Sequence, residues 1–138
     1  KPGTVIEGFV RIGSNCSIGP NAYLRGHVSI GNNCVVGNAV EIKNSILGNA
    51  VFVSHLTYIG DSVLEDDINV GGGCIFSNFR HDAGEIRMPW QGTLHHTGLN
   101  KLGCYIGSHS RIGCKCVILP GRIIPAGTHT YPGSVIKD

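Results

Sequence analysis

The sequence of 138 residues predicts an all-β fold, a parallel β-helix of six-residue units with one long inserted loop of about residues 77–101. Aliphatic residues recur at near-constant six-residue steps, and a small or β-branched residue follows most of them at a fixed interval. The 21 glycines are scattered among β-branched residues, which favours frequent tight turns over disorder. Because one unit buries too little apolar surface to stand alone, neighbouring coils must cover one another.

The aliphatic series fixes the expected register of the coils. Its members, at steps of five or six, are Ile6, Ile12, Ile18, Leu24, Ile30, Val36, Ile42, Leu47, Val53, Ile59, Leu64, Val70 and Phe76, and after the loop Ile106, Ile112, Ile118 and Ile124. Four positions further on we expect a second inward residue: Val10, Cys16, Ala22, Val28, Cys34, Val40, Val51, Val63, Ile68, Cys74, Ser110 and Cys116. With three units to a coil, residues about 18 apart stack at roughly 4.8 Å.

Length and charge indicate one domain over residues 1–138 with small-molecule partners. A formal net charge of +2 gives no strong field, so we expect neither nucleic-acid nor membrane binding. The chain has no apolar run of about 20 residues and no signal-peptide pattern at its start, which predicts a cytoplasmic protein.

The six cysteines are predicted to be mainly buried free thiols. Cys16, Cys34, Cys74, Cys116 and, by extrapolation, Cys104 occupy the small inward position. The first two are one coil apart and close enough for a disulfide, but no secretory context supports one. The Cys114 and Cys116 pair is a weak metal motif because the two side chains should point to opposite sides, so no metal site is expected.

The segment 77–101 breaks the repeat and holds the only Trp, the only Met and three of the seven histidines. A loop this long within a solenoid is usually functional. A covering or subunit-contact role for Trp90 is the alternative, and the two roles are compatible.

Two features of the regular coils indicate a binding site. Arg25 and Lys43 each follow an inward aliphatic residue and are 18 apart, so they should stack, and a phosphate would relieve their repulsion. An ordinary solvated charge ladder that includes Glu7 explains the same spacing. His55 should lie beside Gly72 of the next coil, which leaves open space next to its imidazole.

Five motifs make the chain resemble a known family over nearly its whole length: YLRG at 23–26, GNAVEIKNSILG at 37–48, SHLTYIGDS at 54–62, INVGGG at 68–73 and SNFRHD at 77–82. They resemble the acetyltransferase domain of bifunctional sugar-1-phosphate nucleotidyltransferase and amino-sugar-1-phosphate acetyltransferase proteins, within the hexapeptide-repeat acyltransferases. The resemblance implies a left-handed coil, a homotrimer, and a chain that is the C-terminal part of a longer nucleotidyltransferase.

The resemblance also implies a reaction and its residues. Acetyl-CoA, the co-substrate, would acetylate the amino group of glucosamine-1-phosphate or galactosamine-1-phosphate, a step in nucleotide-sugar biosynthesis. The family's catalytic base falls on His55, its phosphate-binding cations on Arg25 and Lys43, and its sugar and acetyl contacts on Tyr58, Asn69 and Asn78. The backbone near Gly72 would face the thioester carbonyl, and a neutral imidazole suits the proton transfer.

The coenzyme contacts follow from the same resemblance. Ser108 of YIGSHS and Ala126 of IPAGT match the family's acetyl-CoA groove, and Lys101 is our assignment for a lysine of the bacterial loop. The chain departs from bacterial members in Phe79, where they carry tyrosine, and in ending without their C-terminal arm.

Two alternative functions use the same kind of scaffold. A noncatalytic trimerisation or regulatory domain of a sugar nucleotidyltransferase would need the same scaffold without the chemistry. A zinc enzyme of the β-helical carbonic anhydrase type is disfavoured because no two histidines are five residues apart.

Overall fold

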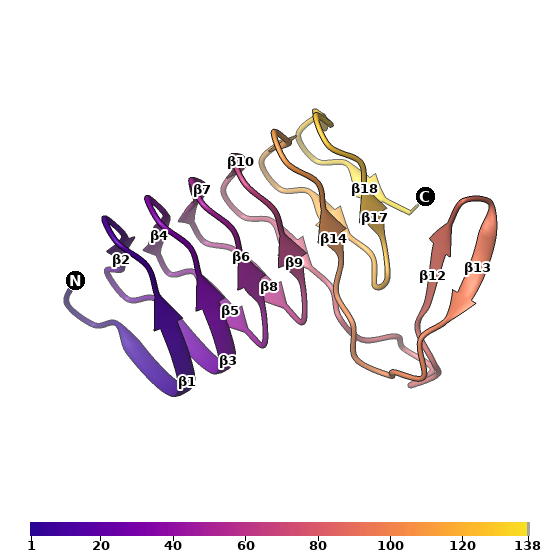
Figure 1. Ribbon diagram of the computed structural model, residues 1–138, viewed down its shortest axis with the longest axis horizontal. Helices are drawn as coiled ribbons and strands as arrows, with labels where there is room; N and C mark the ends of the chain where they lie inside the picture. Colours follow the sequence, from indigo (N-terminus) through magenta and orange to yellow (C-terminus); the bar gives the residue numbers. More distant parts are fainter. Residues whose placement is uncertain (138) are drawn as a thin grey trace.

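The computed structural model describes residues 1–137 as a solenoid of parallel strands with one projecting hairpin (Figure 1). No helix forms within that range, so it holds none that could cross a membrane. The predicted all-β parallel β-helix with one inserted loop is confirmed.

Two parallel sheets wind around the solenoid. The larger sheet contains β1 (Val5–Ile12), β3 (Tyr23–Ile30), β5 (Glu41–Lys43), β6 (Ile46–Leu47), β8 (Tyr58–Gly60), β9 (Val63–Leu64), β11 (Ile75–Phe76), β14 (Tyr105–Ile106), β16 (Val117–Ile118), β17 (Ile123–Ile124) and β18 (Val135–Ile136). The smaller sheet contains β2 (Ser17–Ile18), β4 (Val35–Asn38), β7 (Val51–His55), β10 (Ile68–Val70) and β15 (Arg111–Ile112).

The larger sheet bends around a corner, so each coil has three faces. The first half of β3 pairs with β5 and its last residues pair with β6. We call face A the side formed by the first halves of β1 and β3 with β5, β8, β11, β16 and β18, and face B the side formed by the ends of β1 and β3 with β6, β9, β14 and β17. Face C is the smaller sheet. A coil therefore runs from A to B to C.

The aliphatic series fills the core in the predicted register. Leu24, Ile42 and Ile59 stack on face A, at steps of 18 and 17 residues because some units have five residues. Ile6 and Ile12 keep the register but are 52 % and 36 % exposed, since no described coil covers them.

One part of the second inward series is wrong. Val63 pairs with Ile46 at an outer strand position and is half-buried, while Ser62 is the buried residue of that turn. In a five-residue unit the inward turn residue comes three positions after the aliphatic, not four. Ser45 is buried in the preceding coil for the same reason.

The inserted segment carries an antiparallel hairpin of β12 (Arg87–Trp90) and β13 (Thr93–His96), which projects beyond the end of β14 (Figure 1). Its two-residue turn has positive φ at Gln91 (48°) and Gly92 (75°), the requirement of a type I′ turn. At its base Ile86 is only 1 % exposed, and its amide donates to the Leu99 carbonyl at 2.8 Å.

The cysteine prediction is confirmed for the core positions. All six thiols are free; Cys34, Cys74, Cys104 and Cys116 are buried, Cys16 is half-buried and Cys114 is exposed. Within residues 1–137 no group of three or more His, Cys, Asp or Glu side chains is arranged to hold a metal ion.

Candidate functional site

The two cations predicted to stack do so on face A, but each has a carboxylate partner. Arg25 and Lys43 are register partners on β3 and β5. Arg25 pairs with Glu41 at 2.7 Å, and Lys43 pairs with Asp61 at 3.1 Å. Repulsion between the cations is thus relieved within the chain, and the argument that it calls for a phosphate does not hold. Glu7 stands beside Arg25 in register, as the charge ladder predicts, but its carboxylate accepts the hydroxyl hydrogen bond of Tyr23 and forms no ion pair with Arg25.

Asp61 is the centre of a polar cluster that ties three strands together. It accepts hydrogen bonds from Lys43, from Asn44 at 3.1 Å and from Asn78. Burial raises the pKa of the Asp61 carboxyl, but the hydrogen bonds from Asn78, Lys43 and Asn44 outweigh burial, and the net pKa lies below its ordinary value. The carboxylate is therefore held in its charged form.

Tyr58 joins the same cluster through Asn78. The Asn78 amide donates to the Tyr58 hydroxyl at 3.1 Å, and burial raises the pKa of that phenol. A side chain at Gly60 would clash with the Tyr58 hydroxyl, so the glycine provides the room in which the ring lies. The structure thus brings together Lys43, Tyr58 and Asn78, three of the predicted substrate residues, with Arg25 on the neighbouring strand.

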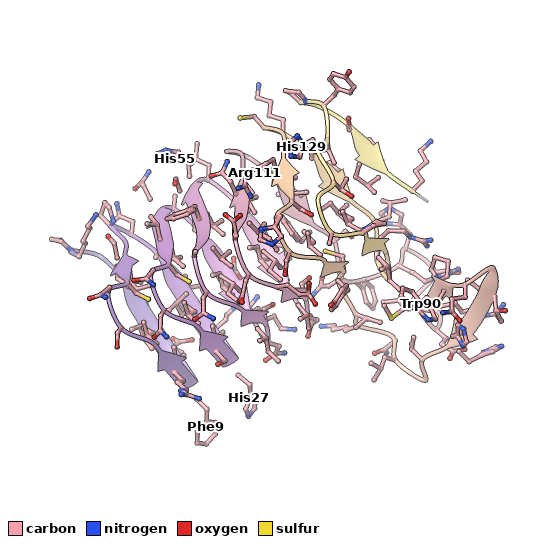
Figure 2. The ribbon with its side chains drawn as sticks, turned by 45° about the horizontal axis from the view of Figure 1, so that its top comes forward. Phe9, His27, His55, Trp90, Arg111 and His129 are labelled. Atoms are coloured by element: carbon pink, nitrogen blue, oxygen red, sulfur yellow. The ribbon has the colours of Figure 1, made fainter. Side chains whose placement is uncertain are left out.

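His55 lies at the corner where face C passes into face A, at the end of β7 (Figure 2). Its carbonyl accepts from the Thr57 hydroxyl at 2.8 Å and from the Gly73 amide at 3.2 Å, which fixes the backbone. The side chain is exposed, and no residue of the described chain hydrogen-bonds its ring. A Cβ atom at Gly72 would lie 3.4 Å from the His55 Cβ, which confirms that the two positions are neighbours.

The backbone around Gly72 offers one free donor. The amide of Gly71 donates to Ile112 at 2.8 Å and that of Gly73 donates to His55, whereas the Gly72 amide has no acceptor within residues 1–137. Of the three glycine amides, only that of Gly72 remains available for a substrate oxygen.

Two predicted groups lie away from this corner. Asn69 is exposed on β10, between Phe52 and Arg111 in register, and so lies on face C whereas Asn78 follows β11 on face A. Lys101 forms an isolated antiparallel β-bridge with Phe79 at the base of the inserted loop. Its ammonium lies 5.8 Å from the centre of the Phe79 ring.

The predicted coenzyme residues gather at the opposite corner of face C. Ser108 lies in the turn between β14 and β15, and the Gly127 amide beside Ala126 donates to the Ser108 carbonyl at 2.8 Å. The amide and hydroxyl of Ser108 each donate to Glu65 at 2.8 Å. The Tyr105 hydroxyl also donates to Glu65 and, with the two Ser108 bonds, lowers the pKa of that carboxyl.

The carboxylates Glu41, Asp61 and Glu65 were missed by the sequence reasoning. The available signal for Asp61 is its 17-residue spacing from Asn44 and from Asn78, which equals one coil in this part of the chain. Three polar residues at that step predict a ladder of hydrogen bonds.

Solved structures confirm the class of fold. An N-acyltransferase from Bacillus cereus, determined in complex with dTDP and coenzyme A, matches with a TM-score of 0.64 at 19 % identity over 94 % of this chain and 74 % of that protein. Such neighbours are left-handed β-helix proteins, which agrees with the predicted hand of the coil.

Sequence comparison then gives the family. The model of the GMPPB C-terminal domain matches residues 4–84, more than half of the chain, and the chain belongs to that family. A relative from Sulfurisphaera tokodaii, a bifunctional sugar-1-phosphate nucleotidylyltransferase/acetyltransferase, is 41 % identical over 99 % of this chain and 34 % of its own length. A bifunctional GlmU protein of Heliobacterium modesticaldum is 33 % identical over 92 % of this chain and 28 % of its own. The chain thus spans about a third of these relatives, and the predicted resemblance is confirmed.

Proposed function

We propose that the chain transfers an acetyl group from acetyl-CoA to the amino group of an amino-sugar-1-phosphate, either glucosamine- or galactosamine-1-phosphate. The observation that carries the proposal is the exposed, unpartnered imidazole of His55, at a corner beside Gly72, which carries no side chain, and next to the polar cluster of face A. The name of the Sulfurisphaera relative, which joins sugar-1-phosphate and acetyl transfer, supports it.

In this proposal His55 acts as the general base. The substrate amine attacks the thioester carbonyl, His55 takes the proton that the nitrogen loses, and the C–S bond breaks to release the coenzyme thiol, which takes up a proton. The free amide of Gly72 would stabilise the oxyanion, and one such donor contributes about 3 to 4 kcal/mol where it has been removed.

The acceptor would lie over face A and reach toward His55. Arg25 and Lys43 would bind the sugar phosphate after exchanging Glu41 and Asp61 as partners, since arginine–phosphate pairs are strong and often bidentate. Tyr58 and Asn78 would contact the sugar, and Asn69 the acetyl group.

We further propose a homotrimer in which one site uses two copies. In one copy, His55 and the coenzyme residues Ser108 and Ala126 lie at opposite ends of the face C strands. A coenzyme at the Ser108 corner of one copy would therefore present its thioester to His55 of another, and Lys101 would act from the inserted loop. The reaction would take place in the cytoplasm, a compartment that keeps thiols reduced.

The proposal is tested by thiol release from acetyl-CoA with each amino-sugar phosphate, for the parent chain and for His55→Ala. We expect release with at least one sugar and a loss of roughly 10² to 10⁴-fold in kcat for the variant. Well-formed oligomers that release no thiol with either sugar would instead favour the noncatalytic domain.

A further inference from the structure

A groove lies between the base of the inserted hairpin and the turn that leads into β17. Its deeper part has a volume of about 550 Å³, within the range of small-molecule sites. A shallower part of about 390 Å³ continues toward Phe79 and shares Arg80, Leu119 and Pro120 with it. Figure 1 shows the hairpin strand β12 on the side of β17, the last strand of face B.

Three arginines line the deeper part of the groove. Arg80 is neutralised by Asp82, at 2.6 Å. Arg87 and Arg122 have no carboxylate partner within residues 1–137, so the groove is cationic at the hairpin and at the turn.

The one carboxylate that lines this deeper part is already occupied. Glu85 accepts the Gly98 amide at 2.7 Å and pairs with His96 at 2.9 Å, and these two bonds lower the pKa of the carboxyl. Glu85 therefore holds the hairpin base together, and although its charge acts on Arg87, it forms an ion pair with neither Arg87 nor Arg122.

Arg122 also carries a buried donor without a hydrogen bond. Its Nε atom is buried and has no partner in the described chain. Leaving such a group unpaired costs about 1 to 3 kcal/mol, more for a charged group, and a native protein usually satisfies it with water or a ligand. Because Arg122 lines the cavity, an anion bound there would meet a guanidinium group that no carboxylate of the described chain pairs with.

The base of the hairpin packs closely against the turn that leads into β17. Gly121 has φ of +74°, and a Cβ atom there would lie 2.7 Å from both the Arg87 carbonyl oxygen and the Ile86 Cγ2 atom. This close approach fixes the start of β12 against the turn, and so fixes the spacing between the backbones of Arg87 and Arg122.

We propose that this groove binds a phosphate-bearing, nucleotide-like molecule, with Arg87 and Arg122 on the phosphate and Leu94, Leu119 and Pro120 against its less polar body. Guanidinium groups match phosphate geometry, and a mixed cationic and apolar lining suits a ligand with both parts. The phosphate could come from a free nucleotide or from the nucleotide end of the coenzyme. Ala126, which the resemblance assigns to the coenzyme groove, lies on the same coil as Arg122.

Binding would be followed by the fluorescence of Trp90, the only tryptophan and part of β12, while each probe is titrated in. Calorimetry is the second readout. The probes are inorganic phosphate, ADP, coenzyme A and dephospho-coenzyme A, against the parent chain, Arg122→Ala, Arg87→Ala and the control Arg11→Ala on β1. Arg87 is exposed, so its variant remains informative if Arg122→Ala folds poorly. The His55→Ala variant should bind ADP like the parent chain, which keeps this test separate from the proposed acetyl transfer.

We expect the parent chain and Arg11→Ala to bind ADP alike, and both groove variants to bind it roughly tenfold more weakly, as loss of a charge-assisted hydrogen bond predicts. A fall in ADP affinity with unchanged coenzyme affinity assigns the groove to a free nucleotide, and a parallel fall for both coenzymes assigns it to the coenzyme. The proposal is overturned if no probe binds at millimolar concentration, or if both groove variants bind like the parent.

Discussion

At the residue scale, the proposed site combines one unpartnered imidazole with cations that are already paired. No residue of the described chain hydrogen-bonds the His55 ring, whereas Lys43 would have to give up Asp61 to bind a phosphate. Both Lys43 and Asp61 have side chains only 15 % exposed, so water and salt screen this ion pair less than they screen one on the surface. Asp61 therefore sets the position of Lys43 and, through Asn78, that of Tyr58.

An Asp61→Asn variant tests this positioning role. The amide keeps the size of the side chain but removes the charge and turns one of the two acceptor oxygens into an NH2 donor, so Lys43 and Asn78 no longer share a carboxylate. We expect KM for the sugar phosphate to change by roughly tenfold, with a smaller effect on kcat, because the change lies in ground-state binding. The matched control is Asp82→Asn, an exposed carboxylate on the inserted loop. Equal kinetics for Asp61→Asn and the parent would rule the role out.

Thiol reactivity tests the register at single residues. Burial raises the pKa of Cys104 to about 12 and that of Cys74 to about 11, so both stay neutral at pH 8, while Cys114 is exposed. We expect a disulfide reagent to modify Cys114 rapidly in the native protein and all six thiols after denaturation. Cys114→Ser should abolish the rapid phase, and rapid loss of a buried thiol in that variant would contradict the register.

At the element scale, the inserted loop is the part that positions a second binding surface. The buried Ile86 and the close approach at Gly121 fix the hairpin base to the solenoid, while the hairpin tip projects away with Trp90 about half exposed (Figure 2).

Alanine at Gly121 measures the strength of that contact. Gly121 and Gly127 both have positive φ, 74° and 72°, but a Cβ atom at Gly127 meets nothing within 4 Å. Gly127→Ala should cost only the backbone term, about 1 to 2 kcal/mol, and Gly121→Ala should cost about 1 to 3 kcal/mol more from overpacking. Urea unfolding of both variants gives the difference, and equal destabilisation would show that the hairpin base yields freely.

The sequence predicts some elements well and others poorly, for physical reasons. The aliphatic series predicts the rungs from Ile6 to Ile124 because a parallel coil must stack apolar residues on apolar residues, but it does not reach β18, where Ile136 stacks on Ile118. Val63 was misplaced because a five-residue unit shortens the turn and brings Ser62 inward instead. The hairpin within 77–101 has no repeat to reveal it. The pairing of Arg25 with Glu41 depends on side-chain conformations across coils, which spacing alone does not determine.

At the scale of the whole molecule, the chain is a stack of coils in which each contacts only its neighbours. The ion pairs between coils lie on its outside. Three carboxyls that bond between coils have a lowered pKa, those of Asp61, Glu65 and Asp67, and so does Glu85 at the hairpin base.

Acid should therefore weaken the whole stack. Each carboxyl has a lower pKa folded than unfolded, so its contribution to stability is complete above the ordinary values of 3.8 for Asp and 4.5 for Glu. That contribution is lost as the pH falls through the lower folded values, because the unfolded chain then binds more protons. We expect Tm to be constant between pH 7 and pH 6 and to fall steeply below pH 4. Scanning calorimetry checks this, and an unchanged Tm at pH 3 would contradict it.

The proposed assembly joins His55 of one copy to Ser108 and Ala126 of another. Mixed oligomers of His55→Ala with an Ala126→Trp variant, each inactive alone, should regain part of the activity, because some interfaces would combine two intact halves. No recovery in oligomers shown to have mixed would place the whole site within one copy.

Acetyl transfer to the amino-sugar phosphate is tested most directly by following the acetyl group itself. Acetyl-CoA labelled with ¹³C in the acetyl carbonyl is incubated with glucosamine- or galactosamine-1-phosphate, and the label is followed by NMR for the parent chain and His55→Ala. We expect an amide carbonyl signal on one sugar with the parent chain, and its rate of appearance should be lower by roughly 10² to 10⁴-fold in the variant. Label that stays on the coenzyme with both sugars, or that moves equally fast in His55→Ala, would contradict it.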